Sequence, residues 1–238
     1  MAKDWERSAQ AWVDFVDQGD PNREFLLDDV ALRLIGNPQG LSIVDIGCGE
    51  GRFCRKLLAL GASVTGVDPV EDLIETARAR DKSGGYSVGS GTRLPLRDAQ
   101  FDVAILYLVL IDIKDFEQAI LETKRVLKPG GRVLVVNLNG FATTQAPAWL
   151  RNEVGEPQHV AVDNYFVIKG EMLQWKGIQV VNWHRPLQDY FQAFLRAGLV
   201  LEWFEEARPT SEQVQSCPQI ALHERVPLFN AHVWRKPD

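Results

Sequence analysis

The sequence has few of the residues that indicate a disulfide-stabilised or metal-binding protein. Its 238 residues include three cysteines and four histidines. The cysteines, Cys48, Cys54 and Cys217, are odd in number and have no paired spacing, as expected for reduced thiols in a reducing compartment. No histidine pair has the spacing of metal ligands. We therefore expect neither a disulfide nor a metal site.

Long apolar runs and an excess of basic charge are also missing. The longest apolar run, residues 103–111, is well short of the roughly 20 residues that a membrane-spanning helix needs. Residues 1–10 mix charges with Trp5 and lack the layout of a secretory signal. Lysine and arginine total 26 against 32 acidic residues, a net charge of −6 that argues against general nucleic-acid binding. These absences predict a soluble, cytoplasmic protein that binds neither membranes nor nucleic acids.

The residues that are present predict a globular α/β domain. Hydrophobic residues make up 45% of the chain, enough for a packed core. In residues 4–35 the apolar positions recur at helical spacing around a break at Gly19, Asp20 and Pro21, which predicts two short helices.

From residue 41 onward, compact apolar runs alternate with amphipathic stretches. We predict strands at 41–46, 63–67, 86–88, 101–107 and 132–137, and helices at 53–60, 72–80 and 115–127. Lys-Pro-Gly-Gly at 128–131 is expected to end the last of these helices. Such alternation predicts a doubly wound, mainly parallel sheet with helices on both faces.

The alternation lapses after Asn137 and resumes at a predicted helix, 187–197, with Gly198 as its C-terminal cap. Two strands, near 200–204 and 227–234, complete the chain. The intervening segment is rich in aromatic residues: Phe141, Trp149, Tyr165, Phe166, Trp175 and Trp183. We interpret it as an insertion in a single domain, which divides into a helical cap (1–40), a core (41–137), the insertion (138–186) and a closing helix with two strands (187–238).

A glycine loop follows the first predicted strand. Residues 44–51 read Val-Asp-Ile-Gly-Cys-Gly-Glu-Gly, a strand running into a turn that lets the backbone approach a ligand closely. A dinucleotide fingerprint requires a third glycine at position 52, where this chain has Arg52. A phosphate-binding P-loop requires Gly-Lys-Ser or Gly-Lys-Thr, which is missing.

Acidic residues end two neighbouring predicted strands. A carboxylate at Asp45 repels a pyrophosphate but holds an ammonium group through a charge-assisted hydrogen bond. Asp68 ends the next strand, where an acid usually binds a ribose diol. Either acid alone is as consistent with a helix cap. Together they favour a ligand that joins an adenosine to a charged amino acid.

These segments resemble the class I S-adenosylmethionine-dependent methyltransferases, in particular the small-molecule group related to quinone-biosynthesis methyltransferases. The resemblance covers residues 41–137 and rests on 44–51, 67–68, 94–96 with 101–102, and 125–131. It implies a Rossmann-like sheet of seven strands with the last one antiparallel, and S-adenosyl-L-methionine as cofactor. The cofactor contacts that we predict are Asp45, Gly47, Cys48, Gly49, Asp68, Pro69, Ser90, Gly91, Thr92 and Tyr107.

The chain departs from the family pattern in two places. Where relatives often carry an acid for the adenine amino group, this chain has Ser90, Gly91 and Thr92, whose hydroxyl or backbone amides would take that role. Where many relatives carry a histidine pair after the fourth strand, it has Ile111 and Asp112. We interpret Asp112 as structural rather than substrate-facing.

The acceptor side offers fewer signals. Methyl transfer mainly requires alignment of the partners and exclusion of water, and a phenol or enol acceptor also needs a base. We predict His184 as that base, with Trp183, Arg185 and Tyr165 as substrate contacts. The competing interpretation of His184 is a packed histidine that caps a loop. The aromatic residues of the insertion either form a lid over a flat acceptor or belong to the ordinary core.

The resemblance therefore predicts transfer of a methyl group from S-adenosylmethionine to a small, aromatic or apolar acceptor, with O-methylation favoured over N- or C-methylation. The alternative is a non-catalytic S-adenosylmethionine-binding sensor or scaffold. Arg52 and Asp45 argue against a nicotinamide oxidoreductase. We expect a monomer or homodimer.

Overall fold

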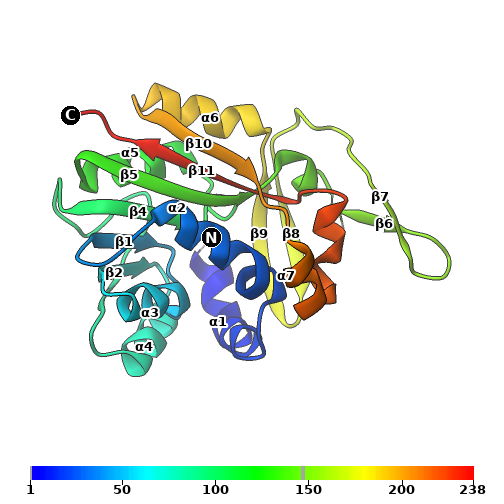
Figure 1. Ribbon diagram of the computed structural model, residues 1–238, viewed down its shortest axis with the longest axis horizontal. Helices are drawn as coiled ribbons and strands as arrows, with labels where there is room; N and C mark the ends of the chain where they lie inside the picture. The colour runs from blue at the N-terminus through cyan, green and yellow to red at the C-terminus, as the bar shows by residue number, and fades with distance from the viewer. Residues whose placement is uncertain (1, 146–147) are drawn as a thin grey trace.

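The computed structural model describes residues 2–145 and 148–238. A seven-stranded sheet forms its centre, with strand order β10-β11-β5-β4-β1-β2-β3 (Figure 1). The strands are β1 (Ser42–Ile46), β2 (Ser63–Asp68), β3 (Gly85–Val88), β4 (Phe101–Tyr107), β5 (Leu127–Leu138), β10 (Val200–Glu206) and β11 (Phe229–Arg235). Strand β11 runs antiparallel to both of its neighbours, β10 and β5, and all other neighbouring pairs in this sheet are parallel. The predicted mainly parallel sheet with an antiparallel last strand is confirmed.

Two helical layers cover the sheet. The helices and single turns are α1 (Ala2–Asp17), η1 (Arg23–Leu27), α2 (Asp28–Ile35), α3 (Arg52–Ala59), α4 (Glu71–Arg80), α5 (Phe116–Val126), η2 (Gly140–Thr143), α6 (Leu187–Arg196), α7 (Ser211–Ser216) and η3 (Pro218–Glu224). Because successive strand residues point to opposite faces, Ile105 packs in the core under α2 and α3, and Leu106 packs under α5 and α6. The apolar strands thus contribute side chains to the hydrophobic clusters on both faces of the sheet.

The Lys-Pro-Gly-Gly segment differs from the prediction. Helix α5 ends at Val126 and β5 begins at the next residue, so no loop separates them. The register shifts from Phe101 opposite Leu127 to Val103 opposite Arg132, and Gly130 has φ of +72°. The segment is therefore an irregular first part of β5, for which glycine supplies the left-handed backbone.

The insertion forms two antiparallel hairpins. Strand β6 (Trp149–Arg151) pairs with β7 (Pro157–Val160), and β8 (Lys169–Trp175) pairs with β9 (Ile178–His184). Lys176 and Gly177 form the two-residue turn of the second hairpin, and both have positive φ, as primed hairpin turns require.

The β8–β9 hairpin lies against α1 (Figure 1). The Ser8 hydroxyl donates to the Gln179 carbonyl at 3.1 Å and accepts from the Gln179 amide at 3.0 Å. Helix α1 and the β8–β9 hairpin, called the cover below, therefore form one layer although they are far apart in the sequence. Within the described residues, no helix has the length and apolar character required to cross a membrane.

Candidate cofactor and acceptor site

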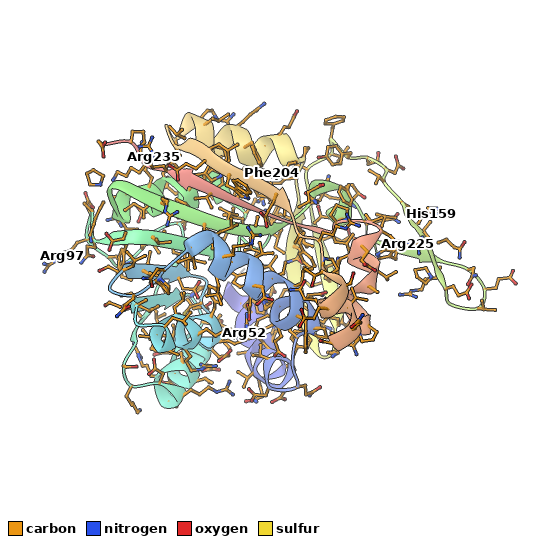
Figure 2. All side chains as sticks on the ribbon, viewed as in Figure 1. Arg52, Arg97, His159, Phe204, Arg225 and Arg235 are labelled. Carbon is orange, nitrogen blue, oxygen red and sulfur yellow. The ribbon has the colours of Figure 1, made fainter. Side chains whose placement is uncertain are left out.

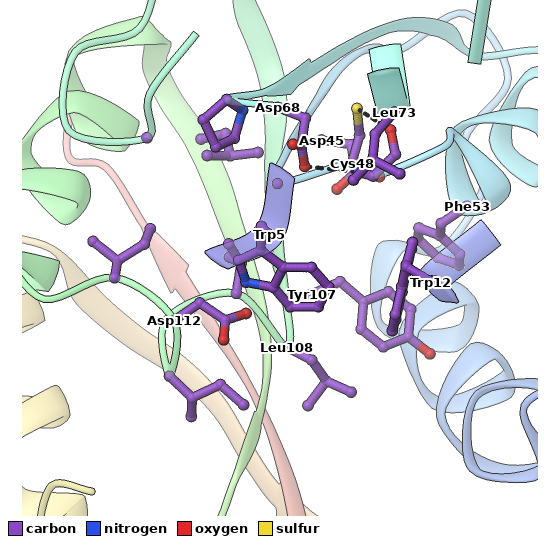
Figure 3. Close-up of a pocket in the computed structure, with 18 of the residues that line it drawn as sticks. Trp5, Trp12, Asp45, Cys48, Phe53, Asp68, Leu73, Tyr107, Leu108 and Asp112 are labelled. Atoms are coloured by element: carbon purple, nitrogen blue, oxygen red, sulfur yellow. Dashed lines mark hydrogen bonds between the residues drawn. The ribbon is translucent and has the colours of Figure 1, made fainter. Parts of the chain in front are cut away.

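A cavity of about 650 Å³ opens at the carboxyl ends of β1, β2 and β4. Ligands of open parallel sheets bind at this edge. The cover contributes Trp5, Trp12 and Phe15 from α1 and Leu173 and Trp175 from β8 to its wall (Figure 3). All ten residues that the sequence analysis predicts as cofactor contacts line this cavity.

The glycine loop brings its backbone to the cavity wall at two positions. Gly47 and Gly49 have φ of +79° and +55°. A Cβ atom on Gly47 would lie 2.4 Å from Cγ2 of Val109, and one on Gly49 would lie 3.1 Å from Nε1 of Trp12. Both positions therefore require glycine, because neighbouring side chains pack directly on the loop backbone.

Asp45 presents a carboxylate that the protein leaves half satisfied. Its Oδ2 accepts a weak hydrogen bond from Cys54 Sγ at 3.4 Å, while Oδ1 is buried and has no partner among the described residues. Burial raises the pKa of Asp45 to about 7. Since buried acceptors are normally paired, the free oxygen fits a ligand that supplies a cationic donor.

Asp68 is held rigidly beside the same loop. Its Oδ2 accepts from the Gly49 amide and its Oδ1 from the Val70 amide, both at 2.9 Å. Burial raises the pKa of Asp68 to about 6, against the opposing effect of these two hydrogen bonds. Each oxygen keeps a second lone pair. The carboxylate is thus positioned to accept hydrogen bonds from a pair of hydroxyls.

The residues that replace the family's adenine-binding acid form a small polar turn. The hydroxyls of Ser90 and Thr92 lie 2.8 Å apart, and the Thr92 amide donates to Ser90 Oγ at 3.2 Å. A Cβ atom on Gly91 would lie 3.1 Å from Cδ1 of Ile113. This turn offers hydroxyls beside an apolar surface, which fits a purine.

Tyr107 joins the cavity to an ionic cluster behind it. Its hydroxyl donates to Asp28 Oδ1 at 2.9 Å, and Asp28 also accepts from Arg52 at 2.6 and 2.9 Å and from Lys56 at 2.6 Å. Burial raises the pKa of Tyr107 well above its usual value, so the phenol is neutral. Arg52 occupies the position of the missing third glycine and ties α3 to α2 (Figure 2).

The structure does not place His184 at this cavity. His184 is 2% exposed, with Nδ1 2.7 Å from Thr143 Oγ1 and Nε2 2.9 Å from the Tyr165 carbonyl oxygen. Both ring nitrogens are therefore occupied by neighbours. This geometry corresponds to the packed, loop-capping histidine rather than to a base.

Arg185 is also buried away from the cavity and has a structural role. Its guanidinium donates to the carbonyl oxygens of Leu110 at 3.1 Å, Ile113 at 2.7 Å and Lys114 at 2.9 Å. These bonds fix the loop between β4 and α5, which forms one wall of the cavity. Arg185 thus shapes the site indirectly, and no acidic substrate is needed to balance its contacts.

The other two predicted substrate contacts lie outside the cavity as well. The Tyr165 hydroxyl accepts from the Leu187 amide at 3.0 Å, and Trp183 packs against Lys114 and Arg185. Among the described aromatic residues of the insertion, only Trp175 lines the cavity. Most of the predicted aromatic lid is therefore absent from this wall.

The aromatic wall comes mainly from α1, which the sequence analysis described only as part of a helical cap. Trp5 and Trp12 contact edge to face with centroids 5.4 Å apart, and Phe15 lies 5.7 Å from Trp12. Arg23, ion-paired with Asp20, stacks 4.8 Å above the Trp12 ring. The spacing of seven and three residues placed these rings on one helix face and was a signal available in the sequence.

The described residues contain no group of three or more histidine, cysteine or acidic side chains that is arranged to hold a metal ion.

Replacement of His184 tests the structural assignment. We expect His184→Ala to lower the free energy of unfolding by about 1–3 kcal/mol, because it leaves Thr143 and the Tyr165 carbonyl without their partner. Affinity for S-adenosylhomocysteine should stay unchanged. Thermal unfolding and calorimetry measure the two effects, with His159→Ala on exposed β7 as the control (Figure 2). A fully stable His184→Ala protein would contradict the assignment.

Comparison with known proteins agrees with this geometry. Residues 44–135 match the family model described as a methyltransferase domain. The chain is 33% identical over 136 residues to malonyl-[acyl-carrier protein] O-methyltransferase of Serratia marcescens, covering 56% of this chain and 52% of that protein. It is 32% identical over 104 residues to ubiquinone biosynthesis O-methyltransferase of Bartonella bacilliformis, covering 42% of each. The chain thus spans about half the length of these relatives or less.

A solved structure is similar over nearly the whole chain. The S-adenosylmethionine-dependent methyltransferase from Mesorhizobium loti superposes with a TM-score of 0.78 at 28% identity, covering 92% of this chain and 99% of that one. Residues 44–135 thus form a methyltransferase domain, and the chain is similar in sequence and fold to the class I S-adenosylmethionine-dependent methyltransferases, including those of quinone biosynthesis.

Proposed function

We propose that this chain binds S-adenosylmethionine in the cavity and transfers its methyl group to a small molecule. The observation that carries the proposal is the pair of buried carboxylates that end β1 and β2, one of which has an oxygen without a partner. When bound, S-adenosylmethionine supplies a methyl group on a sulfonium that already carries the activating charge. The chain's own residues are left to bind, align and exclude water.

Each part of the cofactor has a group in the cavity wall that suits it. Asp45 Oδ1 accepts from the ammonium, Asp68 accepts from the ribose hydroxyls, and the turn at 90–92 holds the adenine. Gly47 and Gly49 keep side chains out of the space between the two acids. A pyrophosphate in the same place would be repelled by Asp45.

The acceptor is a small aromatic or apolar molecule, and O-methylation is favoured. The remaining wall is built from indole, phenyl and aliphatic side chains of the cover and of the loop after β4. Such a surface stabilises a flat apolar ligand through burial. Two relatives described above are named as O-methyltransferases, which supports the same choice of atom.

Calorimetric titration tests the cofactor assignment first. We expect the purified protein to bind S-adenosylmethionine and S-adenosylhomocysteine with micromolar Kd and to leave NAD unbound, because Asp45 repels a pyrophosphate and Arg52 stands where a dinucleotide fingerprint needs glycine. An acceptor screen that detects S-adenosylhomocysteine then separates an enzyme from a non-catalytic binding protein. NAD binding without binding of the adenosyl ligands would reject the proposal.

Asp68→Asn tests the ribose contact. The variant loses the charge and one acceptor oxygen but keeps the size of the side chain, so we expect affinity for S-adenosylhomocysteine to fall about 10- to 100-fold. Asp72→Asn, at an exposed position in the first turn of α4, is the matched control and should bind like the wild type. Equal affinity of a folded Asp68→Asn protein would remove Asp68 from the site.

The two raised pKa values predict how binding depends on pH. Asp45 and Asp68 must be ionised to hold the ligand, so affinity for S-adenosylhomocysteine should fall as pH drops through about 7 and then about 6. Each proton taken up costs about tenfold in affinity per pH unit below the pKa of its group.

The free protein should show the opposite trend in stability. Because these folded-state pKa values lie above the unfolded ones, their contribution to stability is complete below about pH 4 and is lost as pH rises through 6 to 7. Calorimetry and thermal unfolding across this range measure both trends. Binding that does not change with pH would show that neither carboxylate contacts the ligand.

A further inference from the structure

One carboxylate of the cavity wall is not explained by the cofactor. Six carboxylic residues line the cavity: Asp20, Asp45, Glu50, Asp68, Asp112 and Asp115. Two of them form ion pairs with arginine, two end β1 and β2 beside the glycine loop, and one caps α5. Asp112 remains. It has no ion pair among the described residues, although it is buried.

A neutral donor holds Asp112 in place. Its Oδ1 accepts from Asn182 Nδ2 of β9 at 2.5 Å, and Trp5 of α1 lies beside it (Figure 3). In Figure 3 the carboxylate points into the cavity beside Trp5, away from Asp45 and Asp68. The cover therefore orients Asp112 without neutralising it, and the earlier interpretation of a purely structural side chain does not explain this placement.

The surroundings of Asp112 are apolar. Its loop contributes Leu108, Ile111 and Ile113 to the cavity wall, and the cover adds Trp175 on another side. A carboxylate among such side chains gives a flat apolar ligand one strong hydrogen-bond acceptor. The ligand that fits this part of the cavity is an aromatic ring that carries a hydroxyl group.

We propose that Asp112 is the catalytic base for O-methylation of a hydroxyl-bearing aromatic acceptor, an inference that rests on the proposed function. The acceptor hydroxyl donates its hydrogen bond to the carboxylate. As the acceptor oxygen forms its bond to the methyl carbon, the S–CH₃ bond breaks with its electron pair on sulfur, and the proton passes to Asp112. The products are a methyl ether, a neutral thioether and a protonated Asp112.

The electrostatics of this part of the cavity suit this role. Burial raises the pKa of Asp112 to about 8, while the neighbouring Trp5 side chain and the charge of Arg23 act in the opposite direction. Asp68 adds to the rise and Asn182 opposes it. A base with a raised pKa lies closer to an ordinary phenol at about 10 and takes its proton more readily. The ionised, active form is present above about pH 8.

A pair of matched probes tests hydrogen bonding to Asp112 without turnover. We would measure binding of 2-naphthol and its methyl ether, 2-methoxynaphthalene, to the protein saturated with S-adenosylhomocysteine. The preference for the naphthol should rise about tenfold from about pH 7 to about pH 9, as Asp112 ionises. Asp112→Asn should lose this rise, and Glu117→Gln, at an exposed ion pair on α5, should keep it.

A second variant separates a base from a structural side chain. Asn182→Ala removes a donor to the ionised carboxylate, so the midpoint of the pH-dependent preference should move to higher pH. With a hydroxyl acceptor from the screen, Asp112→Asn should lower kcat about 100-fold or more while the affinity for S-adenosylhomocysteine stays the same.

Three results would overturn the inference: no binding of 2-naphthol, a preference that is independent of pH in the wild type, or an unchanged pH dependence in Asp112→Asn. Failure of the proposed function is recognised separately, since S-adenosylhomocysteine would then not bind in the calorimeter. In that case the titration with 2-naphthol and its methyl ether is repeated on the free protein, and the same three results would again overturn the inference.

Discussion

The site depends on the burial of two carboxylates at the ends of neighbouring parallel strands. Parallel pairing of β1 and β2 puts Asp45 and Asp68 at one edge of the sheet, and the glycine loop brings its backbone to the same edge. Removing two acids from water raises both pKa values and is unfavourable unless donors are provided. The protein provides backbone amides to Asp68 and leaves one oxygen of Asp45 unpaired. A ligand with an ammonium group and a diol completes what the fold leaves incomplete.

The second half of the site depends on the cover. Helix α1 and the β8–β9 hairpin are joined at Ser8 and Gln179; Trp5 of α1 lies beside Asp112, and Asn182 of β9 donates to it. Arg185 holds the loop that carries Asp112 through three backbone carbonyls. Segments from the start, the middle and the last third of the chain thus converge on one carboxylate. Under the proposed function, an apolar wall around a single base would select acceptors by shape and by one hydroxyl, while the cofactor half stays common to many acceptors.

Local patterns were sufficient to predict the sheet and a set of residues that the fold gathers at one cavity. The strand ends, the positive-φ glycines and the two acids follow from the spacing in 44–51 and at Asp68, and all of the predicted cofactor contacts line the cavity. The acceptor side of the cavity depends on contacts between segments that are far apart in the sequence. Residue spacing within a local motif does not predict such contacts. His184 and Asp112 illustrate this: the histidine is enclosed by Thr143 and the Tyr165 carbonyl, while the acid is turned inward by Asn182 and Trp5. Helix α7 was missed although its capping box, Thr210 with Gln213, was a readable local signal.

The most direct test of the central claim is a crystal structure of the protein with S-adenosylhomocysteine. The account predicts the ligand ammonium within hydrogen-bond distance of Asp45 Oδ1, the ribose hydroxyls on Asp68 and the adenine beside the turn at 90–92. A ligand bound elsewhere, or one bound in the cavity that leaves Asp45 Oδ1 without a partner, would contradict it.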